Sequence, residues 1–165
     1  MSIERLWAGW RAAYVEGVAN VEPPPDGCLF CTLPDATGDQ DEVLARGPQS
    51  FAVLNLYPYT SGHLLVAPNR HVGDLELLNP DEADALMAMT QQATAALKAA
   101  YRPDGVNVGM NLGRAAGAGV PGHLHVHVVP RWLGDTNFLT SVAETRVLPE
   151  PLSRSFERLR AAWPT

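Results

Sequence analysis

The chain has 165 residues, 46% hydrophobic and 18% charged, and carries a net charge of −6 at pH 7. This length and composition predict one domain, residues 1–165, and exclude a disordered chain. The acidic balance argues against a nucleic-acid partner, and the absence of a long apolar run or a basic, apolar leader argues against a membrane protein or a signal peptide. We therefore expect a soluble, cytoplasmic protein.

The first predicted elements in chain order are a helix and a hairpin. Ser2 can cap an amphipathic helix whose aromatic-rich stripe would dock on the core or on a partner subunit. Two apolar runs, 51–56 and 63–67, flank a turn that contains proline and glycine. They predict two adjacent antiparallel strands.

A long helix and two further strands should follow. Asn79 can cap a helix that begins at Pro80 and runs to about Tyr101, with acidic residues near the positive end of its dipole. We expect its buried stripe to consist of Ala83, Leu86, Met87, Thr90, Ala93, Leu97 and Ala100. Residues 105–112 alternate as a strand, and a glycine-rich loop separates them from a neighbouring histidine-rich strand.

The C-terminal residues 151–163 can form an amphipathic helix. Together these elements predict an α+β fold: a mostly antiparallel sheet with one long helix and flanking terminal helices.

Three of the five histidines stand at alternate positions in the apolar run from Gly122 to Arg131. Because side chains alternate along a strand, Leu124, Val126 and Val128 would enter the core while the imidazoles share the other face. Such a row could be a polar strand face, a set of metal ligands or a catalytic site. We favour catalysis, because neutral imidazole can attack phosphorus at physiological pH.

The run from His123 to Val129 resembles the signature of the histidine triad (HIT) family of nucleotidyl hydrolases and transferases. The resemblance covers about residues 28–138 and implies a HIT-like fold. The segments 55–59 and 130–138, with residues 5–7, resemble in particular a bacterial branch that phosphorolyses diadenosine tetraphosphate.

The resemblance implies a role for each histidine of the site. His125 would attack the α-phosphorus and form a nucleotidyl-histidine, which water or inorganic phosphate then resolves. His127 would contact the phosphate oxygens and help the leaving group, and His63 would support the pair from an adjacent strand. We expect activity to fall on acidification near the ordinary histidine pKa of about 6.5, because the attacking imidazole must be neutral.

Further residues of the predicted site bind the substrate. By resemblance, Asn55 and Asn111 would contact ribose and phosphate. The glycine-rich loop can offer backbone N–H groups to phosphate at Gly117, Ala118 and Gly119, although a simple flexible turn is the alternative. Val120 stands where family members often carry serine or threonine, so the family's side-chain donor to the leaving group is missing.

Both cysteines of the chain lie in one Cys-x-x-Cys motif, Cys28 and Cys31. A redox dithiol is one interpretation, but the βαβ pattern in which such motifs usually stand is absent. A zinc site is the other, and two thiolates then need two further ligands. In zinc-containing members of the family the matching positions are His71 and His123, which implies a structural zinc ion and gives His123 a structural role.

The leading functional hypothesis is phosphorolysis of diadenosine tetraphosphate to ATP and ADP, with a nucleotide and inorganic phosphate as the partners in the reaction. Hydrolysis of dinucleoside polyphosphates and of adenosine phosphoramidates are close alternatives. A silent nucleotide-binding protein and a zinc hydrolase that uses all three histidines as ligands are alternatives from other classes. The resemblance also implies a homodimer.

Overall fold

The computed structural model describes residues 27–35, 42–135 and 150–164. The helix predicted from Ser2 and the segment from Thr136 to Phe138 lie outside these residues. The helices and strands follow one another along the chain as α2 (Leu29–Thr32), β1 (Val43–Arg46), β2 (Ser50–Leu54), β3 (Leu64–Pro68), α3 (Pro80–Tyr101), β4 (Gly105–Met110), β5 (Val126–Arg131) and α5 (Leu152–Ala161).

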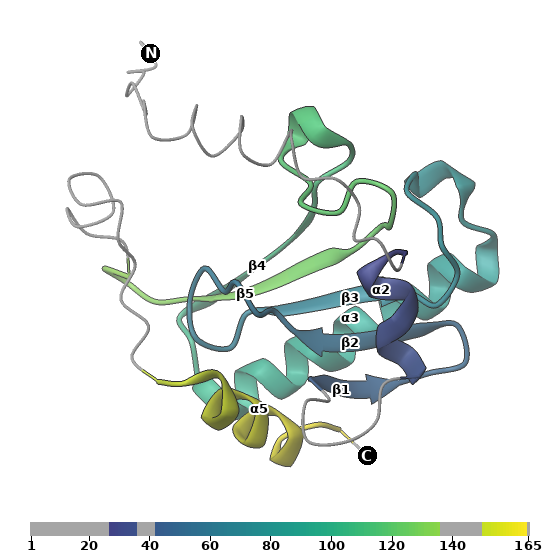
Figure 1. The fold of residues 1–165 in the computed structure, drawn as a ribbon. Coiled ribbons are helices and arrows are strands. Elements are labelled where there is room, and N and C mark those ends of the chain that lie inside the picture. The colour runs from purple at the N-terminus through teal and green to yellow at the C-terminus, as the bar shows by residue number, and fades with distance from the viewer. Residues whose placement is uncertain (1–26, 36–41, 136–149, 165) are drawn as a thin grey trace, which may run out of the picture.

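The strands form one antiparallel sheet in the order β1-β2-β3-β5-β4 (Figure 1). The predicted hairpin of β2 and β3 is confirmed, with Val53 opposite Leu65. The predicted neighbours β4 and β5 pair along their length. The histidine strand starts later than predicted, because regular pairing begins only at Val126. The α+β architecture that the sequence predicts is therefore confirmed.

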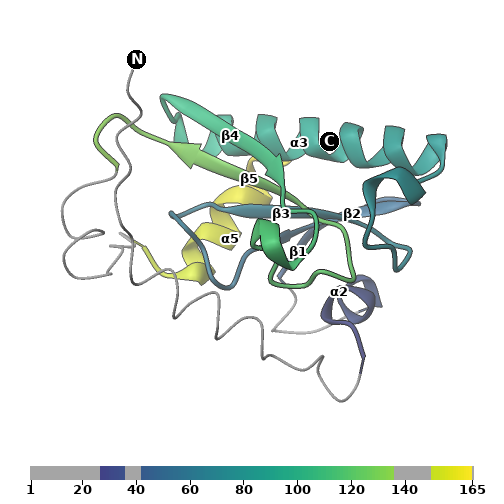
Figure 2. The same cartoon turned by 90° about the horizontal axis from the view of Figure 1, so that it is seen from above.

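Helix α3 covers one face of the sheet, and the short helix α2 lies on the opposite face (Figure 2). The predicted helix start is confirmed: the Asn79 side chain accepts from the Glu82 N–H at 2.9 Å, and the Glu82 carboxylate accepts from the Asn79 N–H at 3.0 Å. The predicted stripe is partly wrong. Ala83 is exposed, Met87 is 54% exposed, and Met89 is buried instead. Each residue turns the helix by about 100°, and the sheet meets the line through Leu86 and Ala93.

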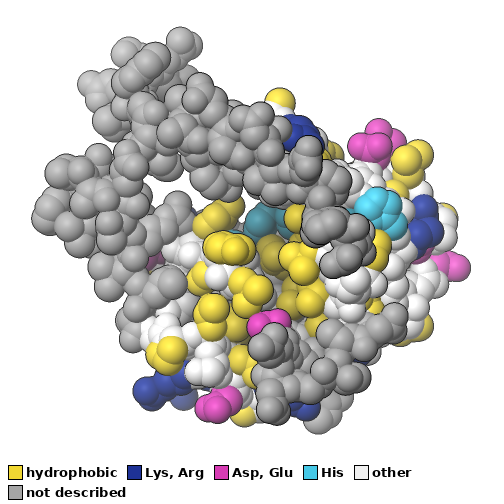
Figure 3. Space-filling model, in the orientation of Figure 1, with side chains coloured by type: hydrophobic (Ala, Val, Ile, Leu, Met, Phe, Trp, Pro, Cys, Tyr) yellow, Lys and Arg dark blue, Asp and Glu magenta, His cyan; other side chains and the backbone are white. Residues whose placement is uncertain are grey.

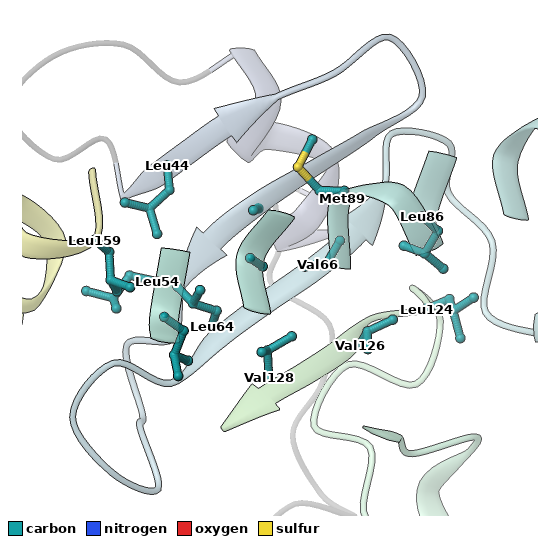
Figure 4. Packing of buried hydrophobic residues seen from close by; sticks show 13 residues of the cluster. Leu44, Leu54, Leu64, Val66, Leu86, Met89, Leu124, Val126, Val128 and Leu159 are labelled. Atoms are coloured by element: carbon teal, nitrogen blue, oxygen red, sulfur yellow. The ribbon is translucent and has the colours of Figure 1, made fainter. Parts of the chain in front are cut away.

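The main core lies between the sheet and the helices α3 and α5 (Figure 4). Leu124, Val126 and Val128 point into it, as the alternation in the sequence predicts. A second, smaller core lies under α2 and contains Phe30, Val43, Phe51, Val53, Leu65 and Ala67. Because the side chains alternate, His125 and His127 face the α2 side.

The helices that the structure describes include none that is both long and apolar enough to cross a membrane.

Candidate functional site

His125 immediately precedes strand β5 and is only 5% exposed. Its Nδ1 lies 2.9 Å from the His123 carbonyl oxygen. A carbonyl can only accept, so we assign the proton to Nδ1, and Nε2 then carries the free lone pair. Burial lowers the pKa of His125, although the hydrogen bond to His123 opposes this. The imidazole is therefore held neutral, with one nitrogen ready to act as a nucleophile.

His63 and His127 form a hydrogen-bonded pair, and a backbone N–H group fixes the tautomer of His63. The Tyr59 N–H donates to Nδ1 of His63 at 3.1 Å, so the proton of His63 belongs on Nε2. That Nε2 lies 3.0 Å from Nδ1 of His127 and donates to it. His127 must then carry its own proton on Nε2.

The Nε2 atom of His127 is buried and has no hydrogen-bond partner within the described part of the chain. Burial, with the neighbouring His125, lowers the pKa of His127 to about 4. The rings of His125 and His127 lie 5.0 Å apart, centroid to centroid. The ring that carries the free lone pair thus lies next to the ring that carries the unsatisfied N–H donor, and this combination suits attack on a phosphate.

The two asparagines occupy strand ends near these histidines. Asn55 follows β2, where its Oδ1 accepts from the Tyr57 N–H at 2.9 Å and its amide nitrogen lies 3.2 Å from Nδ1 of His63. Asn111 follows β4 and donates to the Gly117 carbonyl oxygen at 3.4 Å. Both side chains therefore support the turns that border the histidines.

The glycine-rich loop closes on itself. The Gly117 N–H donates to the Arg114 carbonyl at 2.9 Å, and the Ala118 N–H donates to the Gly113 carbonyl at 3.3 Å. Ala118 is 1% exposed, whereas Gly119 is exposed. In this conformation two of the three N–H groups expected to face phosphate hold the shape of the loop.

The third histidine of the run, His123, joins a cluster with both cysteines. Its Nδ1 lies 3.4 Å from Sγ of Cys28 and 3.6 Å from Sγ of Cys31, which in turn lies 3.3 Å from Nδ1 of His71. The four ligand atoms lie within 4.8 Å of one another. On its other side His123 is held by Pro68, whose carbonyl accepts from Nε2 at 2.8 Å, so Nδ1 is free to bind a metal.

This donor set fits a structural metal better than the two alternatives. Two thiolates and two imidazoles are the ligands of closed tetrahedral zinc sites. Burial and the neighbouring Cys28 raise the pKa of Cys31, whereas a reactive dithiol has a lowered pKa. Over the described ranges the candidate metal ligands include neither His125 nor His127, which argues against a zinc hydrolase built on all three histidines.

Two aromatic residues of the site are not among the predicted site residues. The Phe30 ring, between the two cysteines, lies 5.0 Å from the His125 ring and 5.4 Å from the His123 ring. The Tyr59 ring stacks on His127 at 5.8 Å. Neither belongs to a periodic pattern, and only the meeting of distant segments places them here. On this face of the molecule, histidine side chains reach the surface beside hydrophobic ones (Figure 3).

This geometry agrees with the comparison to known proteins. Residues 37–132 match the HIT domain. The chain therefore belongs to the histidine triad family, as the resemblance of its sequence indicates. It is 43% identical to an "AP-4-A phosphorylase" of Mycobacterium tuberculosis over 98% of this chain and 85% of the relative.

Solved structures show the same fold. A zinc-bound histidine triad family protein from Mycobacterium smegmatis superposes with a TM-score of 0.66 and 32% identity, covering 82% of this chain and 91% of that one. A hypothetical histidine triad nucleotide-binding protein from Sulfolobus tokodaii also gives a TM-score of 0.66, with 27% identity over the same shares of the two chains.

Proposed function

We propose that this protein is a nucleotidyltransferase that phosphorolyses diadenosine tetraphosphate (AP-4-A) to ATP and ADP. The observation that carries the proposal is the pairing of an unprotonated nitrogen on the buried His125 imidazole with a buried, unsatisfied N–H on His127. The similarity to an AP-4-A phosphorylase over nearly the whole chain supports this particular substrate.

The proposed reaction has two displacements at phosphorus. Nε2 of His125 forms a bond to the α-phosphorus of one adenosine, the bond to the bridging oxygen breaks, and ATP departs. The Nε2–H of His127 donates to an oxygen of the transferred phosphate as charge develops there. An oxygen of inorganic phosphate then attacks the adenylyl-histidine, which releases ADP and restores the His125 lone pair.

The surroundings of the histidines support these roles. His125 needs no base to activate it, because the bond to the His123 carbonyl places its proton on the far nitrogen. His63 holds His127 in the one tautomer that presents a donor. Asn55 and Asn111 would contact the ribose and phosphate from the strand ends that border the site.

We propose that Cys28, Cys31, His71 and His123 hold a zinc ion. Bound there, zinc would act as a structural cross-link and supply no chemistry to the reaction. The short helix α2, only four residues long, would thereby be fastened to the segment that carries His125.

A homodimer is the oligomeric state we propose. Among the described strands β4 pairs with β5 alone and lies at the edge of the sheet, where Val108 is 50% exposed. An uncovered edge strand offers backbone groups to a second copy. Light scattering coupled to size-exclusion chromatography tests this: a mass of one chain would exclude it.

Incubation of the protein with AP-4-A and labelled inorganic phosphate tests the proposed reaction, with a His125→Ala control. Labelled ADP and unlabelled ATP, absent in the control, are the expected products. Products that form without phosphate would indicate a hydrolase instead. If AP-4-A is not cleaved, adenosine phosphoramidates become the next substrates to test, and a failure with both would leave a nucleotide-binding role.

A further inference from the structure

Tyr101, the last residue of α3, lies directly against the turn that leads into His63. A β-carbon placed on Gly62 would come within 2.6 Å of Cε2 of Tyr101, much closer than atoms can approach. Gly62 also has a φ of +83°, a conformation that favours glycine. The Tyr101 ring thus fills the space that a side chain on residue 62 would need, close to the backbone one residue before His63.

The opposite side of Tyr101 is held by the C-terminal segment. Its phenol O–H donates to the Glu150 carboxylate, which also accepts from the Ser155 hydroxyl at 2.8 Å. The Arg158 guanidinium lies 5.0 Å from the centroid of the Tyr101 ring, and the Trp132 ring meets it edge-on at 6.2 Å. Tyr101 therefore joins α3, α5, the end of β5 and the turn before His63.

Over the physiological pH range the Tyr101 phenol stays protonated and the Glu150 carboxyl stays ionised, so the hydrogen bond between them persists. Burial and the bond to Glu150 raise the pKa of Tyr101 to about 12, so the phenol remains a donor. Burial by itself would raise the pKa of Glu150, but the bonds from Tyr101 and Ser155 and the charges of Arg158 and Arg154 leave it lowered. The carboxylate therefore remains an acceptor.

We propose that α5 is a positioning element for the His63–His127 pair, and that it acts through Glu150 and Tyr101. The match to the family domain ends at residue 132, so Glu150 and Ser155 lie beyond the matched residues. Gly62 transmits the position of the Tyr101 ring to His63, and His63 fixes the proton of His127 across a 3.0 Å hydrogen bond. The proposed catalytic roles of these histidines rest on the proposed function, but their positioning does not.

Two variants remove the hydrogen bond between Tyr101 and Glu150 while leaving the core filled. Tyr101→Phe deletes only the hydroxyl, and Glu150→Ala deletes the acceptor together with the contacts of Glu150 to Ser155, Arg154 and Arg158. We expect each to lower kcat for AP-4-A about tenfold with KM unchanged, since small displacements of catalytic groups are costly in rate. Glu150→Gln keeps an oxygen acceptor and should restore most of kcat. Glu157→Ala, an exposed change on the same helix, is the matched control and should leave kcat unchanged.

A spectroscopic readout separates positioning from stability and does not depend on turnover. The ¹⁵N chemical shifts of the imidazoles report which nitrogen is protonated. In Tyr101→Phe and Glu150→Ala we expect His63 and His127 to shift toward mixed tautomers, with His71 unchanged. Imidazole shifts equal to those of the wild type, or a lowered melting temperature with kcat unchanged, would overturn the proposal. If the wild type does not cleave AP-4-A, the proposed reaction fails and the ¹⁵N shifts alone decide the positioning.

Discussion

The two ends of the histidine run use the same side chain for different tasks. At one end, Nε2 of His123 donates to the Pro68 carbonyl, and Nδ1 turns toward the two thiols. At the other end, His125 donates from Nδ1 to a carbonyl and keeps Nε2 free, while His127 accepts at Nδ1 and presents an Nε2–H. In each ring, the partner of one nitrogen thus decides what the other nitrogen can do.

The largest effect should come from the catalytic end. His125→Ala removes the proposed nucleophile, and we expect kcat/KM for AP-4-A to fall roughly 10⁴-fold or more. The melting temperature should change little by comparison, because this end holds no metal ligand. Steady-state kinetics together with thermal unfolding measure both quantities. Residual activity within tenfold of the wild type would assign the attack to another group.

His127→Ala should have the next largest effect. It removes a buried N–H donor that has no partner among the described residues, and loss of a preorganised donor of this kind typically costs about 10²- to 10³-fold in kcat. KM should change less than kcat, since the donor acts on charge that develops during the reaction. An effect confined to KM, measured in the same assay, would show that His127 only binds substrate.

The structural end should behave in the opposite way. Cys28→Ser removes a ligand of the proposed zinc site, and we expect the free energy of unfolding to fall by about 3–5 kcal/mol, with a smaller loss of kcat in the protein that remains folded. Metal analysis and thermal unfolding with and without a chelator measure this. The chelator should destabilise the wild type and leave Cys28→Ser unchanged. If wild-type protein purified under reducing conditions contains no zinc, the cysteine cluster is not a zinc site.

The smallest effect concerns pH. Attack needs neutral His125, and burial lowers the pKa of this imidazole, so the acid limb of the rate should lie below the ordinary histidine value of about 6.5. Lowering the pH from 7 to 6 should therefore change the single-turnover rate little, and the decline should come at lower pH. The sequence alone predicts a decline near 6.5. If the rate is half-maximal at pH 6.5 or above, burial does not lower the pKa of His125 in solution.

The sequence predicts the regular elements well, and it predicts the short ones poorly. The spacing of apolar residues and the Asn79 cap predict β2, β3, β4 and α3. Helix α2 and strand β1 escape prediction, because four residues are too few to show a period and their burial depends on partners across the sheet. The exposure of Met87 escapes for a related reason: only the docked sheet selects which side of α3 is buried.

The site divides in the same way. Alternation along the run predicts that His125 and His127 share a face, and the resemblance to the histidine triad family selects the residues of the cysteine cluster. The proton positions depend on the Pro68 carbonyl and the Tyr59 N–H, which are backbone groups that no side-chain pattern reveals. The contact between Tyr101 and Gly62 likewise joins segments that only the fold brings together.

Trapping the covalent intermediate would show whether a nitrogen of His125 attacks while His123 belongs to the proposed zinc site. The protein would be mixed with radiolabelled AP-4-A without inorganic phosphate, quenched, digested under conditions that preserve phosphoramidates, and mapped by mass spectrometry. We predict an adenylyl group on His125, absent in His125→Ala and still present in Cys28→Ser. An adenylyl group on His123 or His127, or turnover without any covalent intermediate, would show that His125 is not the nucleophile.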